Sequence, residues 1–86
     1  MYKLVLSKKV EKILADFQKT NSQLFNQFID ALDKIEENPY CAKALTGNLK
    51  GYYSYRVRNY RIIFEIEKHL LIVYIEKIEH RKEVYK

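Results

Sequence analysis

The sequence has little of what characterises secreted, disordered or membrane proteins: 86 residues include one cysteine, one proline and two glycines. The single Cys41 cannot form an internal disulfide, so a disulfide framework is excluded, and we interpret this residue as a small filler side chain rather than a nucleophile. With 48% hydrophobic residues the chain is not a disordered tail. Its longest apolar run, residues 70–75, is far shorter than the roughly 20 residues of a membrane-spanning helix.

The length allows one domain, which we expect to cover residues 1–86. A domain of this size buries only about 60–65% of the surface that its unfolded chain exposes, which leaves little room for a deep cofactor pocket. We therefore expect no cofactor. Met1 is followed directly by a strand-like segment instead of a long apolar leader, so we expect a cytoplasmic protein that does not enter a membrane.

What the chain does contain is tyrosine and an uneven distribution of charge. It has eight tyrosines and a formal net charge of +5. Residues 1–42 carry six lysines and six acids, whereas residues 43–86 carry ten basic side chains and five acids, so the second half holds the whole net charge. A surface built in this way predicts a polyanionic partner, such as a nucleic acid.

The first half of the sequence predicts a short strand and two helices. Residues 2–6 alternate weakly and end at Ser7, a good helix N-cap, so a helix is expected over residues 8–19. A second helix follows and ends at Asn38, because the residue before a proline is pushed out of the α region. Both helices carry apolar residues at helical spacing: Val10, Ile13, Leu14 and Phe17, then Leu24, Phe25, Phe28, Ile29, Leu32 and Ile35. An antiparallel helical hairpin with two core-facing stripes is expected.

The second half changes to a period of two, which is typical of strands. Residues 40–51 are expected to form a loop, followed by a strand to residue 57, a turn at Arg58-Asn59, a strand to residue 66, and a last strand over residues 70–78. The order β-α-α-β-β-β predicts an α+β fold: a twisted antiparallel sheet with the N-terminal helical hairpin packed on one face.

A two-residue turn would place Arg56 directly opposite Arg61 on the outer face of the sheet. Like charges in this position destabilise a sheet by roughly several tenths of a kcal/mol. Either each arginine is paired with a neighbour such as Glu65 or spread over tyrosine faces, or the two guanidinium groups form a phosphate clamp.

The terminal segment holds further candidates for a site. We expect the chain end to fold back beside the sheet and to bring His80, Arg81 and Tyr85 near the two strand arginines. An imidazole and a phenol there could move protons, and the phenol could also stack on a base. Taken singly, however, a terminal histidine is more often solvated and a terminal tyrosine more often packed. Further nucleic-acid-binding charge is predicted at four positions: Lys43, Lys50, Arg58 and Lys82.

Two segments carry a resemblance to a known family. LKGYYSYRVRNYRIIFEI (residues 49–66) and HRKEVYK (residues 80–86) are similar to the central Y-R-x-R-x-x-Y-R-x-x-Y/F-E block and the H-R-x-x-V-Y ending of the RelE/ParE superfamily of bacterial and archaeal toxins from type II toxin–antitoxin modules. The resemblance implies a microbial RNase-like fold. Its RelE branch cuts messenger RNA in the ribosomal A site, using the RNA's own 2′-hydroxyl as the nucleophile, so the resemblance implies that no bound metal is needed.

The resemblance also implies roles for individual residues. Arg61 aligns with the arginine that contacts the scissile phosphate, Arg56 with a strand basic residue, and Arg81 with the C-terminal basic residue. Tyr85 aligns with a tyrosine that stacks on the base or transfers a proton, and His80 with a histidine that is a candidate acid or base.

One position departs from the family pattern. Ser54 stands where RelE-type members place a second lysine, which leaves the general base to His80, Tyr85 or Lys50.

Three functions therefore remain open at the level of sequence. The first is an endoribonuclease toxin acting on ribosome-bound mRNA, and the second is a ParE-like inhibitor of DNA gyrase without nuclease activity. The third is an adaptor domain that binds RNA or its antitoxin. Each implies a cognate antitoxin as partner, with acidic residues opposite the basic face.

Overall fold

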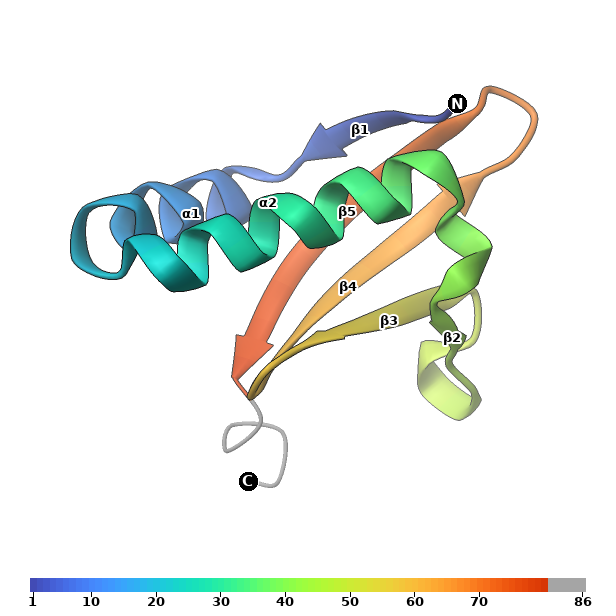
Figure 1. Cartoon of the computed structure of the whole chain (residues 1–86). Helices are drawn as coiled ribbons and strands as arrows, with labels where there is room; N and C mark the ends of the chain where they lie inside the picture. The colour runs from blue at the N-terminus through green and yellow to red at the C-terminus, as the bar shows by residue number, and fades with distance from the viewer. Residues whose placement is uncertain (81–86) are drawn as a thin grey trace.

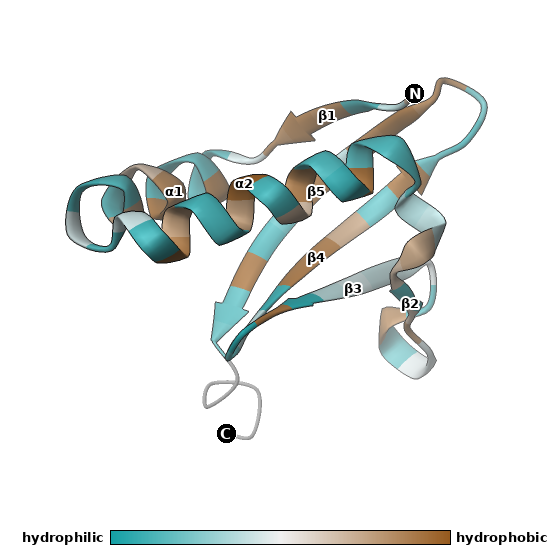
Figure 2. Ribbon diagram, in the orientation of Figure 1, coloured by the Kyte–Doolittle hydropathy of each residue, from teal (hydrophilic) through white to brown (hydrophobic). Residues whose placement is uncertain are grey.

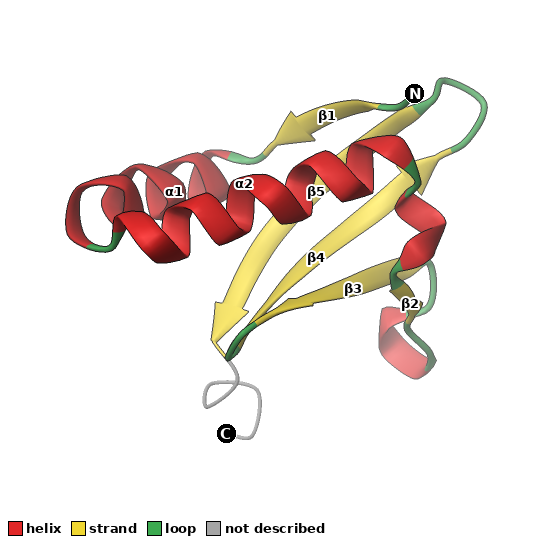
Figure 3. Cartoon of the chain, viewed as in Figure 1, coloured by secondary structure: helices red, strands yellow, loops and turns green. Residues whose placement is uncertain are grey.

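The structure is a computed structural model that describes residues 1–80; Arg81, Lys82 and Tyr85 lie outside the described residues. Figures 1 and 3 show two helices packed on one face of a sheet, which confirms the predicted α+β fold. No helix in this part of the chain is long and apolar enough to cross a bilayer. The elements are β1 (Lys3–Leu6), α1 (Lys8–Thr20), α2 (Ser22–Glu37), the 3-10 turn η1 (Pro39–Cys41), β2 (Lys43–Ala44), the 3-10 turn η2 (Gly47–Leu49), β3 (Tyr52–Val57), β4 (Tyr60–Glu67) and β5 (Ile72–His80).

The sheet has the order β1-β5-β4-β3-β2 and is mixed, which corrects the expectation of a wholly antiparallel sheet. The strands from β2 to β5 pair antiparallel, but β1 runs parallel to β5. The first and last strands of this part of the chain therefore lie side by side (Figure 1). The expected loop at residues 40–51 also contains β2, which pairs with β3. Local sequence patterns carry no information on the direction in which two strands so far apart in the chain will pair.

Each helix begins where a side chain accepts a hydrogen bond from a free backbone amide and ends where a backbone amide donates to one of its last carbonyls. The Ser7 Oγ accepts a hydrogen bond from the amide of Val10 at 3.2 Å and caps α1. Asn21 ends α1 and caps α2, because its side-chain oxygen accepts from the amide of Leu24 at 3.1 Å. Asn38 ends α2 just before the proline, as predicted. Asn21 is therefore the single residue that connects the two helices of the hairpin.

The core fills the space between the helices and the inner face of the sheet. In Figure 2 segments of both helices and of β1, β4 and β5 are brown, whereas β3 is mostly pale. Phe28 of α2 and Phe64 of β4 have no exposed surface. The apolar positions predicted for the helical stripes belong to this core or pack against it. Because the core covers only one face of the sheet, the opposite face, called here the helix-free face, is left for other contacts.

A β-bulge in β5 decides which residues reach the helix-free face. Ile63 of β4 pairs with Lys77, but the next residue, Phe64, pairs with Ile75, so Glu76 is an extra residue in β5. Such an insertion reverses the alternation of side chains for the rest of the strand. Lys77 and Glu79 consequently share the face of Ile63 and Arg61. The Ser7 Oγ donates to the carbonyl of Glu76 at 2.8 Å and ties the bulge to the start of α1.

Candidate nucleic-acid interface

The hairpin of β3 and β4 places two arginines opposite each other, which confirms the predicted register. Val57 pairs with Tyr60 and Arg56 with Arg61, so the turn consists of Arg58 and Asn59. Because Val57 belongs to the core and Tyr60 packs against it, their neighbours Arg56 and Arg61 lie on the helix-free face. The two guanidinium groups therefore start from adjacent strands on the side of the sheet that the helices leave uncovered.

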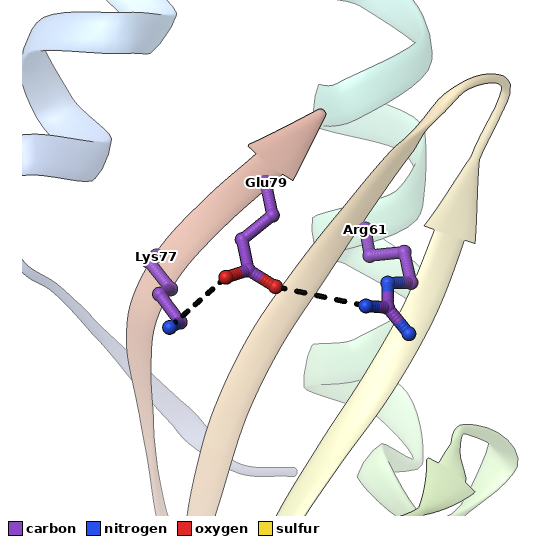
Figure 4. A network of polar contacts seen from close by, with 3 residues as sticks. All are labelled: Arg61, Lys77 and Glu79. Atoms are coloured by element: carbon purple, nitrogen blue, oxygen red, sulfur yellow. Dashed lines mark ion pairs between the residues drawn. The ribbon is translucent and has the colours of Figure 1, made fainter. Parts of the chain in front are cut away.

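Arg61 belongs to an ion-pair network with β5 (Figure 4). Its Nη2 lies 3.8 Å from Oε1 of Glu79, and the other carboxylate oxygen of Glu79 lies 3.0 Å from Nζ of Lys77. Arg61 and Glu79 each keep more than a quarter of their side-chain surface exposed, so solvent screens the pair. Glu79, rather than the neighbour Glu65 considered from the sequence, is thus the partner of Arg61. Without the bulge, the side chain of Glu79 would face the core. The alternation of apolar and polar residues in the sequence therefore could not predict that Glu79 pairs with Arg61.

The helix-free face can be described as three rows of residues that pair across the strands. The first row holds Arg56, Arg61 and Glu79, the middle row Lys43, Ser54, Ile63 and Lys77, and the third row Tyr52, Glu65 and Tyr74. Among the predicted binding residues, Lys43 is therefore brought to the same face as the arginine pair, one row away. Lys50 is exposed in the turn that leads into β3.

His80 does not lie beside the arginine pair, in contrast to the expectation from the sequence. It is the last residue of β5 and pairs with Tyr60, and the two ring centroids are 4.8 Å apart in an edge-to-face arrangement. Tyr60 packs on Phe17 and Phe28 from the helices. His80 therefore points to the helix side, because β5 continues two residues beyond its predicted end and the pleat fixes the direction of each side chain.

Arg58 also turns to the helix side of the sheet. Its Nε donates to Oε1 of Gln27 in α2 at 2.8 Å, and its backbone has a φ of 54°, in the left-handed region. Arg58 and His80 line a cavity of about 310 Å³ at this end of the sheet. Within residues 1–80, the structure thus places Arg56, Arg61 and Lys43 on the helix-free face and Arg58 and His80 on the helix side. Among residues 1–80, no group of three or more His, Cys, Asp and Glu side chains is placed to hold a metal ion.

A prediction follows from the ion-pair network. Replacing Glu79 with glutamine should strengthen the binding of inorganic phosphate to Arg61 by about two- to fivefold, because the carboxylate competes with phosphate for the guanidinium group in an exposed pair worth about 0.4–1 kcal/mol. The measurement is a phosphate titration followed by NMR of the arginine side chain. Glu65→Gln, which removes the same charge from the same face, is the matched control. Equal effects of the two substitutions would mean that Glu79 has no special relation to Arg61.

Comparison with known proteins identifies the family of this chain. Residues 4–85 match the model of the family described as ParE toxin of type II toxin-antitoxin system, parDE. The chain belongs to this toxin family. The predicted resemblance to the RelE/ParE superfamily is thereby confirmed. No curated protein matches the sequence at a significant level.

Solved structures show the same fold for the toxin. The YoeB/ParE toxin from Agrobacterium tumefaciens superposes with a TM-score of 0.79 at 17% identity, covering 91% of this chain and 96% of the other. The RelBE2 toxin–antitoxin complex from Mycobacterium tuberculosis gives 0.76 at 22% identity, with 93% and 98% covered. YafQ from E. coli gives 0.73 at 14% identity and covers both chains completely. At these identities the matches establish the architecture.

Proposed function

We propose that this toxin is a ribosome-dependent endoribonuclease that cleaves mRNA. The observation that carries the proposal is the pair Arg56 and Arg61 on the helix-free face of the sheet. Opposed arginines cost stability in a sheet, and an anion that accepts hydrogen bonds from both guanidinium groups offsets that cost. A phosphate of the RNA backbone has the charge and the oxygen geometry for this role. The choice of messenger RNA as the substrate follows from the resemblance to the RelE branch.

The proposed reaction uses a nucleophile that the substrate itself provides. The 2′-oxygen of a ribose attacks the adjacent phosphorus while the bond from phosphorus to the 5′-oxygen breaks, which leaves a 2′,3′-cyclic phosphate and a 5′-hydroxyl. One proton leaves the 2′-hydroxyl and one is delivered to the 5′-oxygen. Arg61 and Arg56 would bind the phosphate and stabilise the negative charge that develops on its oxygens.

The proton transfers are assigned to residues outside the arginine pair. We propose Tyr85 as the group that accepts the proton of the 2′-hydroxyl, and water as the source of the proton that reaches the 5′-oxygen. Lys50 precedes β3, and the strand from Tyr52 to Arg56 alone spans roughly 13 Å, so Lys50 is retained as a contact with a more distant part of the RNA. Arg81 is retained as a further phosphate contact, with Lys43 and Lys82 along the path of the RNA. His80 points to the helix side and packs on Tyr60. In this arrangement it cannot reach a phosphate bound to Arg61, so it is a catalytic acid or base only if the end of β5 rearranges.

The partner of the toxin is proposed to be a small cognate antitoxin with an acidic segment that covers the helix-free face. Two similar structures, RelBE2 from Mycobacterium tuberculosis and RelBE from E. coli, are described as toxin–antitoxin complexes. Acidic side chains opposite Arg56 and Arg61 would occupy the proposed phosphate site. The same contact would thereby form the complex and block the activity.

The experiment that tests the function adds purified toxin to a translating extract and maps the 5′ ends of a reporter mRNA by primer extension. We expect cuts within codons, and only when ribosomes translate the message. An mRNA that stays intact during active translation would contradict the proposal.

A second function is favoured by the family match itself. The matching family is described as ParE toxin of parDE. The alternative function, inhibition of DNA gyrase without RNA cleavage, is the one that the sequence resemblance implies for the ParE branch. In this case the mRNA would stay intact while gyrase-dependent DNA breaks accumulate in a supercoiling assay. The same preparation of protein can be used in both assays, so one result selects between the two functions.

A further inference from the structure

The helix-free face contains a groove that has no role in the function described so far. Its volume is about 430 Å³, and its lining includes Asn48 of η2, Tyr52 of β3, Ile63 of β4 and Lys77 of β5. The groove therefore crosses the strands of the sheet, and Lys9 from the first turn of α1 also contributes to it. An aromatic ring, an amide, two ammonium groups, the carboxylate of Glu76 and the apolar side chain of Leu49 thus border one depression.

Short or apolar residues form the centre of the helix-free face. Ser54 and Ile63 pair with each other and are almost completely buried, at 8% and 2% exposure, so the longer side chains around them cover most of their surface. The rows on either side carry such long side chains, among them Arg61 in the first row and Tyr52 in the third. Because β3 contributes Ser54 at this position, it adds no long charged side chain next to Ile63.

The groove lies immediately beside the arginine pair. Ile63 follows Arg61 by two residues on the same face of β4, which corresponds to roughly 6.6 Å along the strand. Lys77 belongs to both features, because it lines the groove and its Nζ contacts Glu79, the partner of Arg61. This spacing is comparable to the reach from phosphate to base within one nucleotide. A phosphate held by Arg61 would therefore bring its own base to the groove.

We infer that the groove is a nucleobase subsite for a nucleotide whose phosphate is bound by Arg56 and Arg61. Tyr52 offers a ring on which a base can stack, and Leu49, which is 43% exposed, offers apolar surface beside it, while Ile63 lies largely covered beneath. The side-chain amide of Asn48 can donate and accept hydrogen bonds at the edge of a base. This inference rests on the proposed function in that it takes the bound phosphate to be part of a polynucleotide. It adds where the base of that nucleotide binds.

The test compares two ligands of equal charge, adenosine 5′-monophosphate and ribose 5-phosphate, by NMR titration of the full chain. We expect the nucleotide to bind at least about fivefold more tightly and to shift the amide signals of Tyr52, Ile63 and Lys77, because stacking of a base on an aromatic side chain contributes that much or more. Tyr52→Leu should remove the difference between the two ligands and leave the affinity for ribose 5-phosphate unchanged.

Tyr74→Leu is the matched control, since Tyr74 lies in the same row as Tyr52, on the far side of Glu65. It should leave both affinities unchanged. If Tyr52→Leu does not fold, Asn48→Ala in the exposed turn η2 replaces it, with an expected loss of about two- to tenfold for the nucleotide alone.

Equal affinities for the two ligands, or shifts centred on the cavity of Arg58 and His80, would overturn the inference. The mRNA cleavage assay is independent of this result. Nucleotide binding in the groove with uncut mRNA would leave the subsite in place and refute the nuclease. If the mRNA is cut but the toxin binds adenosine 5′-monophosphate and ribose 5-phosphate equally, the nuclease function is supported and the nucleobase subsite is refuted.

Discussion

Substituting alanine for Arg61 is expected to slow mRNA cleavage in a translating extract by about 10²–10³-fold, which is the usual effect of removing one group that stabilises the charge of a transition state. The fold should survive, because the side chain of Arg61 is partly exposed on the helix-free face and its ion pair with Glu79 is long, at 3.8 Å. The rate is measured by primer extension on the reporter mRNA over time, and the fold by circular dichroism.

Two variants make this result specific to the guanidinium group. Lys68→Ala removes one positive charge from the exposed turn between β4 and β5, at the other end of the sheet from the arginine pair, and should leave cleavage within about twofold of the unmodified toxin. Arg61→Lys keeps the charge but loses the fork that binds two phosphate oxygens, so an intermediate rate is expected. Cleavage at the original rate by Arg61→Ala would show that the arginine pair is not the phosphate site.

Substituting alanine for Phe64 is expected to destabilise the protein by about 3–5 kcal/mol, the typical cost of truncating a buried phenylalanine. Phe64 has no exposed surface and lies on the inner face of β4, the central strand of the sheet. Its ring stacks on that of Tyr53 at 5.8 Å between centroids. Because small domains have a free energy of unfolding of roughly 5–15 kcal/mol, the variant should lose most of its stability. Equilibrium unfolding in urea measures the change.

Leu70→Ala serves as the control for the core substitution. Leu70 is 65% exposed in the turn between β4 and β5, so its truncation should change the free energy of unfolding by no more than about 0.5 kcal/mol. A similar loss of stability in both variants would contradict the assignment of the core to the space between the helices and the sheet. Cells that produce the Phe64 variant should also tolerate it, because an unfolded toxin cannot act.

Local patterns in the sequence were sufficient for the helices and for the β3–β4 hairpin. The capping side chain of Ser7, the proline that follows Asn38 and the apolar spacing of the helices act over a few residues, so they can be read directly from the chain. The turn at Arg58-Asn59 fixes the register of the hairpin, and with it the pairing of Arg56 with Arg61. The central element of the candidate site was therefore predictable, because both arginines lie within one short hairpin.

Tertiary structure alone decided the parallel pairing of β1 with β5, the partner of Arg61 and the direction of His80. All three depend on how β5 aligns with strands elsewhere in the chain. The extra residue Glu76 reverses the alternation of the strand, so that Lys77 and Glu79 reach the helix-free face and His80 points to the helices. The alternation of side chains along a strand does not reveal the position of a bulge. The bulge forms only when the strand pairs with its neighbours.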